Sequence, residues 1–287
     1  MVEIKRMELT EKVCEELKNR GYDVEIEEFH RNNIISEGLV VTFENPYERA
    51  VVYSDMLDYY ADNGFDLNDI CDAVIEASRT HSNYYAESMR RLADPDYILE
   101  NVTVAVCRAD WNAEMLSKVP YRVIEGTDLV LYSRVVLDLN DDENVRSVTV
   151  TSAALDTAVL DTLGLSSDEV LDRAMKNFEK EIIFVSLPKD FPGSMQIVTN
   201  KDIFYGASAI AYPEMLRKVM GEMRCEQLVV IPSSVHEIIV LPYELCLESN
   251  MDISEMIKEV NGSLVDRDLW LSDHHYIFDG TGFVNIL

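Results

Sequence analysis

The stretch "PSSVHEIIVLP" (residues 232–242) carries both a fold signal and a chemical question. Its apolar run, which begins at Ile238, is typical of a buried strand, and we expect that strand to include His236. Side chains alternate along a strand, so His236, Ile238 and Val240 would share one face and Glu237 would lie on the other. We therefore expect a strand covered on both faces, with its histidine and glutamate pointing apart.

The chain before Pro95 shows helical periodicity around one hairpin. Apolar spacing predicts a helix over residues 3–20. Alternating residues predict a β-hairpin over residues 24–43 that turns at Asn32–Asn33, because asparagine tolerates a positive φ. From Val51 to Leu92 the spacing again predicts helices, interrupted at Asn63 and Gly64. Asp66 with Asp69 three residues later predicts a capping box for the next helix.

The chain after Pro95 mixes strand and helix patterns. Runs such as "NVTVAVCR" (101–108) and "DLVLYSRVVLDL" (128–139) predict strands, and "LSSDEVLDRAMKNFEKEI" (165–182) predicts a helix capped by Ser167. Strands follow one another here as well as alternating with helices. We predict an α+β fold: a helical and hairpin N-terminal lobe, then a layered α/β lobe with a mixed, mainly antiparallel sheet. The expected lobes are residues 1–94 and 95–287.

Acidic residues outnumber basic ones 53 to 25 and give a net charge of −28. Such a charge opposes binding to nucleic acid or to anionic membranes and favours a basic protein surface as partner. Mimicry of nucleic acid is a sharper alternative, but the acids are spread along the whole chain. No Lys or Arg occurs between Arg49 and Arg79, where carboxylates recur three or four residues apart. These carboxylates are Asp55, Asp58, Asp62, Asp66, Asp69, Asp72 and Glu76.

The spacing of residues in this acidic segment does not fit a calcium-binding EF-hand loop. An EF-hand loop has oxygen ligands at positions 1, 3 and 5, Gly at 6 and Glu at 12. Counting from Gly64 at position 6 puts Tyr59 at 1, Ala61 at 3 and Ile70 at 12. We therefore expect a solvated acidic helix face.

A hydrolytic site would use His236 as its base. Ser234 lies two residues away, about 6.6 Å along a strand, which exceeds the roughly 2.6–3.2 Å between a nucleophile and its base. No GxSxG elbow is present, so a triad would have to assemble from separate strands, with Asp273 as the orienting carboxylate. The candidate catalytic residues are His236, Ser234 and Asp273, and a true site would bring Ser233 and Asn261 to the same cavity. The alternative is a buried, hydrogen-bonded structural histidine.

A metal site would draw on "SDHHYIF" (272–278). In a regular strand Asp273 and His275 would lie on one face and His274 on the opposite face. Only one of these two histidines could therefore bind a metal together with His236. No HExxH or paired CxxC occurs. We predict neither a metal nor a cofactor.

The five cysteines are an odd number in separate segments, which fits free thiols in a reducing compartment. The N-terminus has no apolar signal region, and no run approaches ~20 apolar residues. We therefore expect a cytoplasmic protein that neither spans nor binds membranes, and the oligomeric state stays open. Our first hypothesis is a non-catalytic binding or regulatory protein with an acidic surface; the alternative is a hydrolase that uses His236.

The order of several segments resembles an uncharacterised bacterial domain-of-unknown-function family of about this length. These segments are "RNNIISEGLVV" (31–41), "VVYSDMLDYYADNGFDLNDI" (51–70), "IVTNKDIFYGASAIAYPEML" (197–216), "VVIPSSVHEIIVLP" (229–242) and "IKEVNGSLVDRDLWLSDHHYIF" (257–278). The resemblance spans essentially the whole chain. It implies a bacterial cytoplasmic protein and supplies no functional residues.

Overall fold

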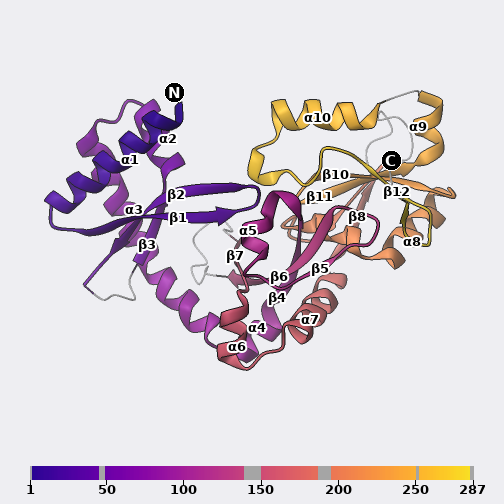
Figure 1. Ribbon diagram of the computed structural model, residues 1–287, viewed down its shortest axis with the longest axis horizontal. Coiled ribbons are helices and arrows are strands. Elements are labelled where there is room, and N and C mark those ends of the chain that lie inside the picture. Colours follow the sequence, from indigo (N-terminus) through magenta and orange to yellow (C-terminus); the bar gives the residue numbers. More distant parts are fainter. Residues whose placement is uncertain (1, 45–48, 139–149, 187–194, 250–251, 285–287) are drawn as a thin grey trace. The chain divides into compact units, whose positions relative to one another are not determined.

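The chain folds into two compact units, one ending at Ala93 and the other beginning at Asp94 (Figure 1). The computed structural model describes residues 2–44, 49–138, 150–186, 195–249 and 252–284. Helices and antiparallel strands occur in both units, so the α+β class predicted from the sequence is confirmed. None of the helices in these described segments combines the length and apolar composition needed to cross a bilayer.

The N-terminal unit is a three-stranded antiparallel sheet, in the order β1-β2-β3, with three helices. Its elements are α1 (Val2–Asn19), β1 (Asp23–Arg31), β2 (Ile34–Thr42), β3 (Arg49–Tyr53), α2 (Ser54–Asp62) and α3 (Leu67–Leu92). The hairpin turns at Asn32 and Asn33 as predicted, and Asn33 has φ 62. The helix predicted from Val51 is wrong at its start, because Val51 and Val52 continue the sheet by pairing with β2. Adjacent β-branched residues suit a pleated strand better than a first helical turn.

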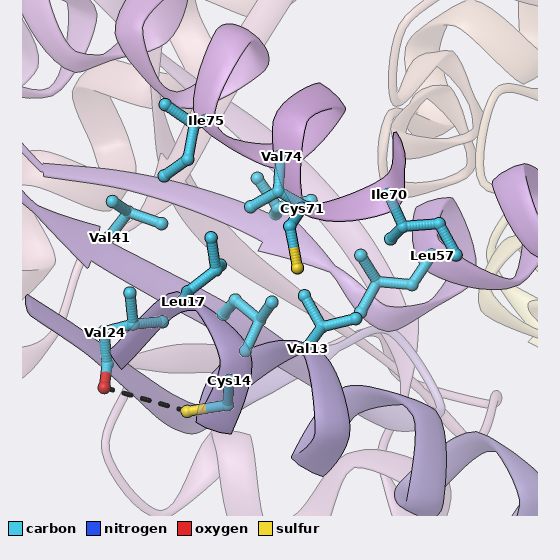
Figure 2. Packing of buried hydrophobic residues seen from close by; sticks show 12 residues of the cluster. Val13, Cys14, Leu17, Val24, Val41, Leu57, Ile70, Cys71, Val74 and Ile75 are labelled. Carbon is cyan, nitrogen blue, oxygen red and sulfur yellow. Dashed lines mark hydrogen bonds between the residues drawn. The ribbon is translucent and has the colours of Figure 1, made fainter. Parts of the chain in front are cut away.

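One face of this sheet carries the core of the unit. Val24, Leu39, Val41 and Val52 share that face and are nearly fully buried. Figure 2 shows side chains of the three helices packed around them. The helical residues are Val13, Cys14 and Leu17 of α1, Leu57 of α2, and Ile70, Cys71, Val74 and Ile75 of α3. The inner faces of α2 and α3 are therefore fixed, and their outer faces meet solvent.

The α2–α3 corner is set by local side-chain chemistry. Asp62 ends α2, and Gly64 follows with φ +84, a conformation that glycine adopts without steric cost. Asp66 then caps α3 by accepting from the backbone N–H groups of Asn68 at 2.8 Å and Asp69 at 3.0 Å. The Asp69 carboxylate accepts from the Asp66 N–H at 3.3 Å, which completes the predicted capping box.

The first part of the C-terminal unit contains a four-stranded sheet in which β6 pairs with β4, β5 and β7. The elements are α4 (Pro95–Asn101), β4 (Val102–Arg108), η1 (Asp110–Asn112), α5 (Ala113–Leu116), β5 (Tyr121–Val123), β6 (Leu129–Asp138), β7 (Val150–Ala154), α6 (Thr157–Leu163) and α7 (Ser167–Glu179). Helix α7 buries Val170, Leu171, Ala174 and Phe178, the face that its apolar spacing predicts. Ser166, not Ser167, occupies its N-cap position, and its side chain makes no capping bond.

The rest of this unit contains a six-stranded sheet in the order β13-β12-β10-β11-β9-β8, antiparallel at every described pair. Its elements are β8 (Ile182–Ser186), β9 (Gln196–Asn200), η2 (Gly206–Ala211), α8 (Pro213–Met223), β10 (Leu228–Ser234), β11 (Glu237–Pro242), α9 (Tyr243–Ser249), α10 (Ile253–Leu264), η3 (Arg267–Leu269), β12 (Tyr276–Phe278) and β13 (Phe283–Val284). Pro213 begins α8 directly after η2, in the first turn of the helix. The η2 turn contacts both sheets, because the Ser208 hydroxyl donates to the Val104 carbonyl of β4 at 3.1 Å.

Candidate functional site

His236 lies in the turn of the β10–β11 hairpin. Strand β10 ends at Ser234 and β11 begins at Glu237, so Val235 and His236 form a two-residue turn. The predicted alternation of His236 with Ile238 is therefore wrong. The Ser234 hydroxyl accepts from the His236 backbone N–H at 3.1 Å, a local turn contact that does not involve the imidazole.

The His236 ring is half-buried beside two aromatic side chains that also contact each other. Its centroid lies 6.1 Å from that of Phe204 and 6.2 Å from that of Tyr205. The buried Nδ1 has no hydrogen-bond partner among the described residues, so the expected hydrogen-bonded structural histidine is not what the structure shows. Burial lowers the pKa of His236, and the carboxylates of Glu237 and Asp268 oppose that shift only in part.

The other predicted residues do not reach the His236 ring through any described hydrogen bond. The Ser233 hydroxyl donates to the Glu237 carboxylate at 3.5 Å, and the Asn261 amide donates to the Ser272 carbonyl at 2.9 Å. Three cavities of ≈ 240, 300 and 610 Å³ are formed by described residues, and neither His236, Ser234 nor Asp273 lines any of them.

Asp273 belongs to a different polar cluster. It precedes β12, which begins at Tyr276, so the predicted strand faces of Asp273, His274 and His275 are wrong. Asp273 Oδ1 lies 2.5 Å from Arg108 Nη1 and 2.9 Å from His274 Nδ1. Burial raises the pKa of Asp273, but hydrogen bonds from His274 and Arg108 and the Arg108 charge outweigh it and lower that pKa to about 2. Asp273 is thus an ionised partner of a fixed cation.

The Arg108 cluster is closed by further carboxylates. Arg108 Nε lies 2.8 Å from Asp110 and 2.9 Å from Asp128, in addition to the Asp273 contact. The Tyr276 hydroxyl donates to Asp128, and burial raises the pKa of Tyr276. Each charge in the cluster has a partner. The arrangement suits a structural link between β4 and the segment before β12 better than acid–base catalysis.

Two tryptophans extend this link. The Arg267 guanidinium lies 4.3 Å from the ring centroids of both Trp111 and Trp270, and Arg108 lies 4.2 Å from that of Trp111. The Trp270 indole N–H donates to the Val265 carbonyl at 2.9 Å. Such cation–π contacts hold the η1 and η3 segments together. No motif in the sequence identifies this stack, because its two halves, Arg108 with Trp111 and Arg267 with Trp270, are more than 150 residues apart.

Thiol chemistry has little support in the described residues. The five cysteines are free, and four of them are buried. Burial raises the pKa of Cys107 to about 12 and also raises the pKa values of Cys71, Cys225 and Cys246. These thiols therefore stay protonated and are weak nucleophiles at neutral pH. Within the same segments, no three His, Cys, Asp or Glu side chains form a metal-binding group.

The N-terminal unit exposes aromatic side chains among carboxylates at the α2–α3 corner. Tyr59 is 64% exposed and Phe65 is 44% exposed, and the ring of Tyr60 lies between them at centroid distances of 5.9 Å and 5.3 Å. We call this region the acidic–aromatic surface. Its exposed members are Asp55, Met56, Tyr59, Asp62, Phe65, Asp66, Leu67 and Asp69. The sequence predicted the acidic stripe but not the aromatic residues exposed within it.

Comparison with known proteins gives one family. The family model described as "Family of unknown function (DUF5688)" matches residues 6–185 and 180–280. No curated protein and no solved structure matches the chain. The matched ranges span nearly the whole sequence and both units, and the chain therefore belongs to the DUF5688 family of unknown function.

Proposed function

We propose that this protein is a non-catalytic binding protein whose N-terminal unit recognises a basic protein partner through the acidic–aromatic surface. The observation that carries the proposal is the exposure of Tyr59 and Phe65 among Asp55, Asp62 and Asp69. Exposed aromatic side chains are typical anchors of protein interfaces, and surrounding carboxylates select a cationic partner.

The surface is preorganised for binding. Leu57 and Ile70, fully or almost fully buried beneath it, tie α2 and α3 to the core in Figure 2. The Asp66–Asp69 capping box fixes the start of α3. Little conformational entropy is then lost when a partner binds, which favours affinity at a small interface.

Charge supports a basic partner over a neutral one. Among the described contacts, the one ion pair of this surface joins Asp55 to Arg31 at 3.5 Å. Asp62 has no Lys or Arg partner in the described segments, and Asp66 and Asp69 accept only backbone N–H groups. With a net charge of −28, the chain attracts a cationic surface over roughly a Debye length, about 8 Å at physiological salt.

The hydrolase alternative gains no support from the site geometry. The Ser234 hydroxyl contacts a backbone N–H, and Asp273 is held by Arg108 and His274. Neither residue supplies the nucleophile–base–carboxylate chain that hydrolysis by His236 requires. We place the binding function in the bacterial cytoplasm, on the sequence resemblance and the free cysteines.

A defined probe tests the proposal. A labelled helical peptide with Arg and Leu on one face is titrated with the full chain by fluorescence anisotropy at low and high salt. A second peptide has Ser in place of Leu, and a third has Glu in place of Arg. We expect saturable binding of the first peptide alone, weakened by salt because screening reduces charge attraction.

Matched variants assign the binding to the surface. The double variant Tyr59→Ser, Phe65→Ser is expected to weaken binding of the Arg–Leu peptide at least about tenfold, since interface aromatics contribute about 2 kcal/mol or more each. Tyr121→Ser is the control, because Tyr121 is 49% exposed in the other unit. Equal affinity of the double variant and the wild type for the Arg–Leu peptide would contradict the proposal. So would binding of the Ser peptide to the wild type as tightly as the Arg–Leu peptide.

A further inference from the structure

Arg134 of β6 is a half-buried cation with no carboxylate partner among the described residues. Its Nε donates to the Ser152 hydroxyl at 2.8 Å, Nη2 to the Ser152 carbonyl at 2.7 Å, and Nη1 to the Tyr132 hydroxyl at 3.3 Å. All three acceptors are neutral. A guanidinium has five N–H groups, so part of its donor capacity lacks a described partner, and its charge meets aromatic rings but no described carboxylate.

Three other half-buried arginines in the described segments show a different pattern. Arg20 contacts Glu16 and Asp72, Arg49 contacts Glu27, and Arg108 contacts three aspartates. A partly desolvated charge without a counter-ion is unfavourable unless something supplies the opposite charge. None of the acidic residues in the described segments forms an ion pair with Arg134, which is compatible with an oxyanion as its counter-ion.

Tyr132 adds a second donor beside the guanidinium. Its hydroxyl accepts from Arg134, so the hydroxyl proton itself has no described acceptor. Burial raises the pKa of Tyr132, which keeps that proton in place at neutral pH. The nearby Cys107 thiol is also neutral. The Tyr132 hydroxyl proton and the remaining N–H groups of Arg134 are therefore donors without a described acceptor.

The loop that covers Arg134 is held in an unusual backbone conformation. The Tyr205 ring centroid lies 4.7 Å from the guanidinium carbon, and Tyr205 has φ 55. Ile203, a β-branched residue, has φ 52. The Asn200 side chain makes two hydrogen bonds to the Phe204 backbone, at 2.8 Å and 2.9 Å, and these hold the loop. Such strained residues cluster at ligand sites, where surrounding contacts compensate their cost.

Gly206 fixes this loop against the His236 turn. A Cβ at Gly206 would lie 2.1 Å from Thr199 Oγ1 and 2.4 Å from the His236 carbonyl oxygen, so only glycine fits. The Tyr205 ring centroid lies 4.7 Å from the Arg134 guanidinium carbon and 6.2 Å from the centroid of the His236 ring.

We propose that Arg134 and Tyr132 form a binding site for a small oxyanion, a phosphate or carboxylate group, with the Tyr205 ring as one wall. The guanidinium supplies charge and N–H donors, and the Tyr132 hydroxyl supplies one further donor. Arginine is suited to this role because its planar fork matches the oxygens of both groups. The site lies in the C-terminal unit and is separate from the acidic–aromatic surface.

Calorimetric titration of the full chain with inorganic phosphate, and separately with acetate, at constant ionic strength tests the site. We expect saturable binding of at least one of the two anions, and the preferred anion identifies the group. Arg134→Gln is expected to weaken binding at least about tenfold, because charge-assisted hydrogen bonds are lost. Arg122→Gln, in the same sheet, should leave it unchanged, since Arg122 already contacts Asp172 at 3.0 Å.

Tyr132→Phe serves as the second variant and retains the buried ring, so it decides the matter if Arg134→Gln does not fold. It is expected to weaken anion binding severalfold while circular dichroism stays unchanged. The proposal is overturned if the wild type binds neither anion. It is equally overturned if Arg134→Gln and Tyr132→Phe, or the one of them that folds, bind the anion as tightly as Arg122→Gln does.

Discussion

Arg108 and Asp273 are 165 residues apart in the sequence, yet Arg108 Nη1 lies 2.5 Å from Asp273 Oδ1. This ion pair joins the end of β4 to the segment that precedes β12, and so connects the two sheets of the C-terminal unit. It also gives Asp273 a role other than the orientation of His236. The ion pair therefore supports a structural role for Asp273 and not a catalytic one.

Asp273→Asn is expected to lower the free energy of unfolding by about 1 kcal/mol, because the Asp273 side chain is 41% exposed and Arg108 keeps two other carboxylates. Urea unfolding followed by circular dichroism measures this change. Asp172→Asn is the control, since its pair with Arg122 is more exposed and should contribute less. If Asp273→Asn does not lower the free energy of unfolding, or lowers it no more than the control does, the Arg108–Asp273 pair does not stabilise the fold.

The stability difference between the wild type and Asp273→Asn should depend on pH. The pKa of Asp273 is about 2 in the folded protein, against about 3.9 in an unfolded chain. A lowered folded pKa stabilises the protein above the unfolded pKa, and the contribution disappears as the pH falls through the folded pKa. We expect a constant difference above about pH 5 that narrows toward pH 2, measured by urea unfolding at each pH. A difference that grows on acidification would contradict the assignment.

Two glycine substitutions should have opposite effects. Gly206→Ala is expected to destabilise the protein by about 2 kcal/mol or more, because its Cβ would overlap Thr199 Oγ1 and the His236 carbonyl. Gly221→Ala, inside helix α8 with open space around it, should stabilise by about 0.5–1 kcal/mol. Thermal unfolding of the two variants and the wild type measures both changes in stability. A tolerated alanine at Gly206 would mean that the loop does not pack against the His236 turn.

The cap of α3 gives a local prediction. Asp66→Ala removes the acceptor of two backbone N–H groups and is expected to cost about 1 kcal/mol. Asp62→Ala removes the same charge at the C-terminal end of α2, where a carboxylate opposes the helix dipole, and should be neutral or slightly stabilising. Urea unfolding compares the two variants. An equal loss in both would show that charge, and not the cap, is responsible.

Local chemistry made part of this fold predictable from the sequence. The Asn32–Asn33 turn and the Asp66–Asp69 capping box each depend on residues within four positions of one another, and both occur as predicted. The start of β3 was misassigned, because the pairing of Val51 with Val40 is a tertiary contact that helical spacing does not reveal. The apolar spacing of α7 was sufficient because its buried face repeats along one helix.

The polar sites were much less predictable. The run "VHEIIVL" is continuously strand-like and predicts a strand that includes His236, because the turn at Val235 has none of the usual Gly, Asn or Asp signals. Arg134 was not singled out at all. Its distinguishing property is the absence of a described carboxylate partner, which depends on strands β6 and β7 and the Tyr205 loop coming together.

The most direct test of the central claim is site-specific photo-crosslinking at the acidic–aromatic surface. A photoreactive phenylalanine analogue replaces Tyr59 or Phe65 in the full chain, or Tyr121 as control, in cells that produce the protein, and mass spectrometry identifies the linked peptides. The account predicts adducts from Tyr59 and Phe65, absent at Tyr121, in which the linked partner segment carries Lys or Arg beside apolar residues. No adduct at either position, equal adducts at Tyr121, or a linked segment with net negative charge would contradict it.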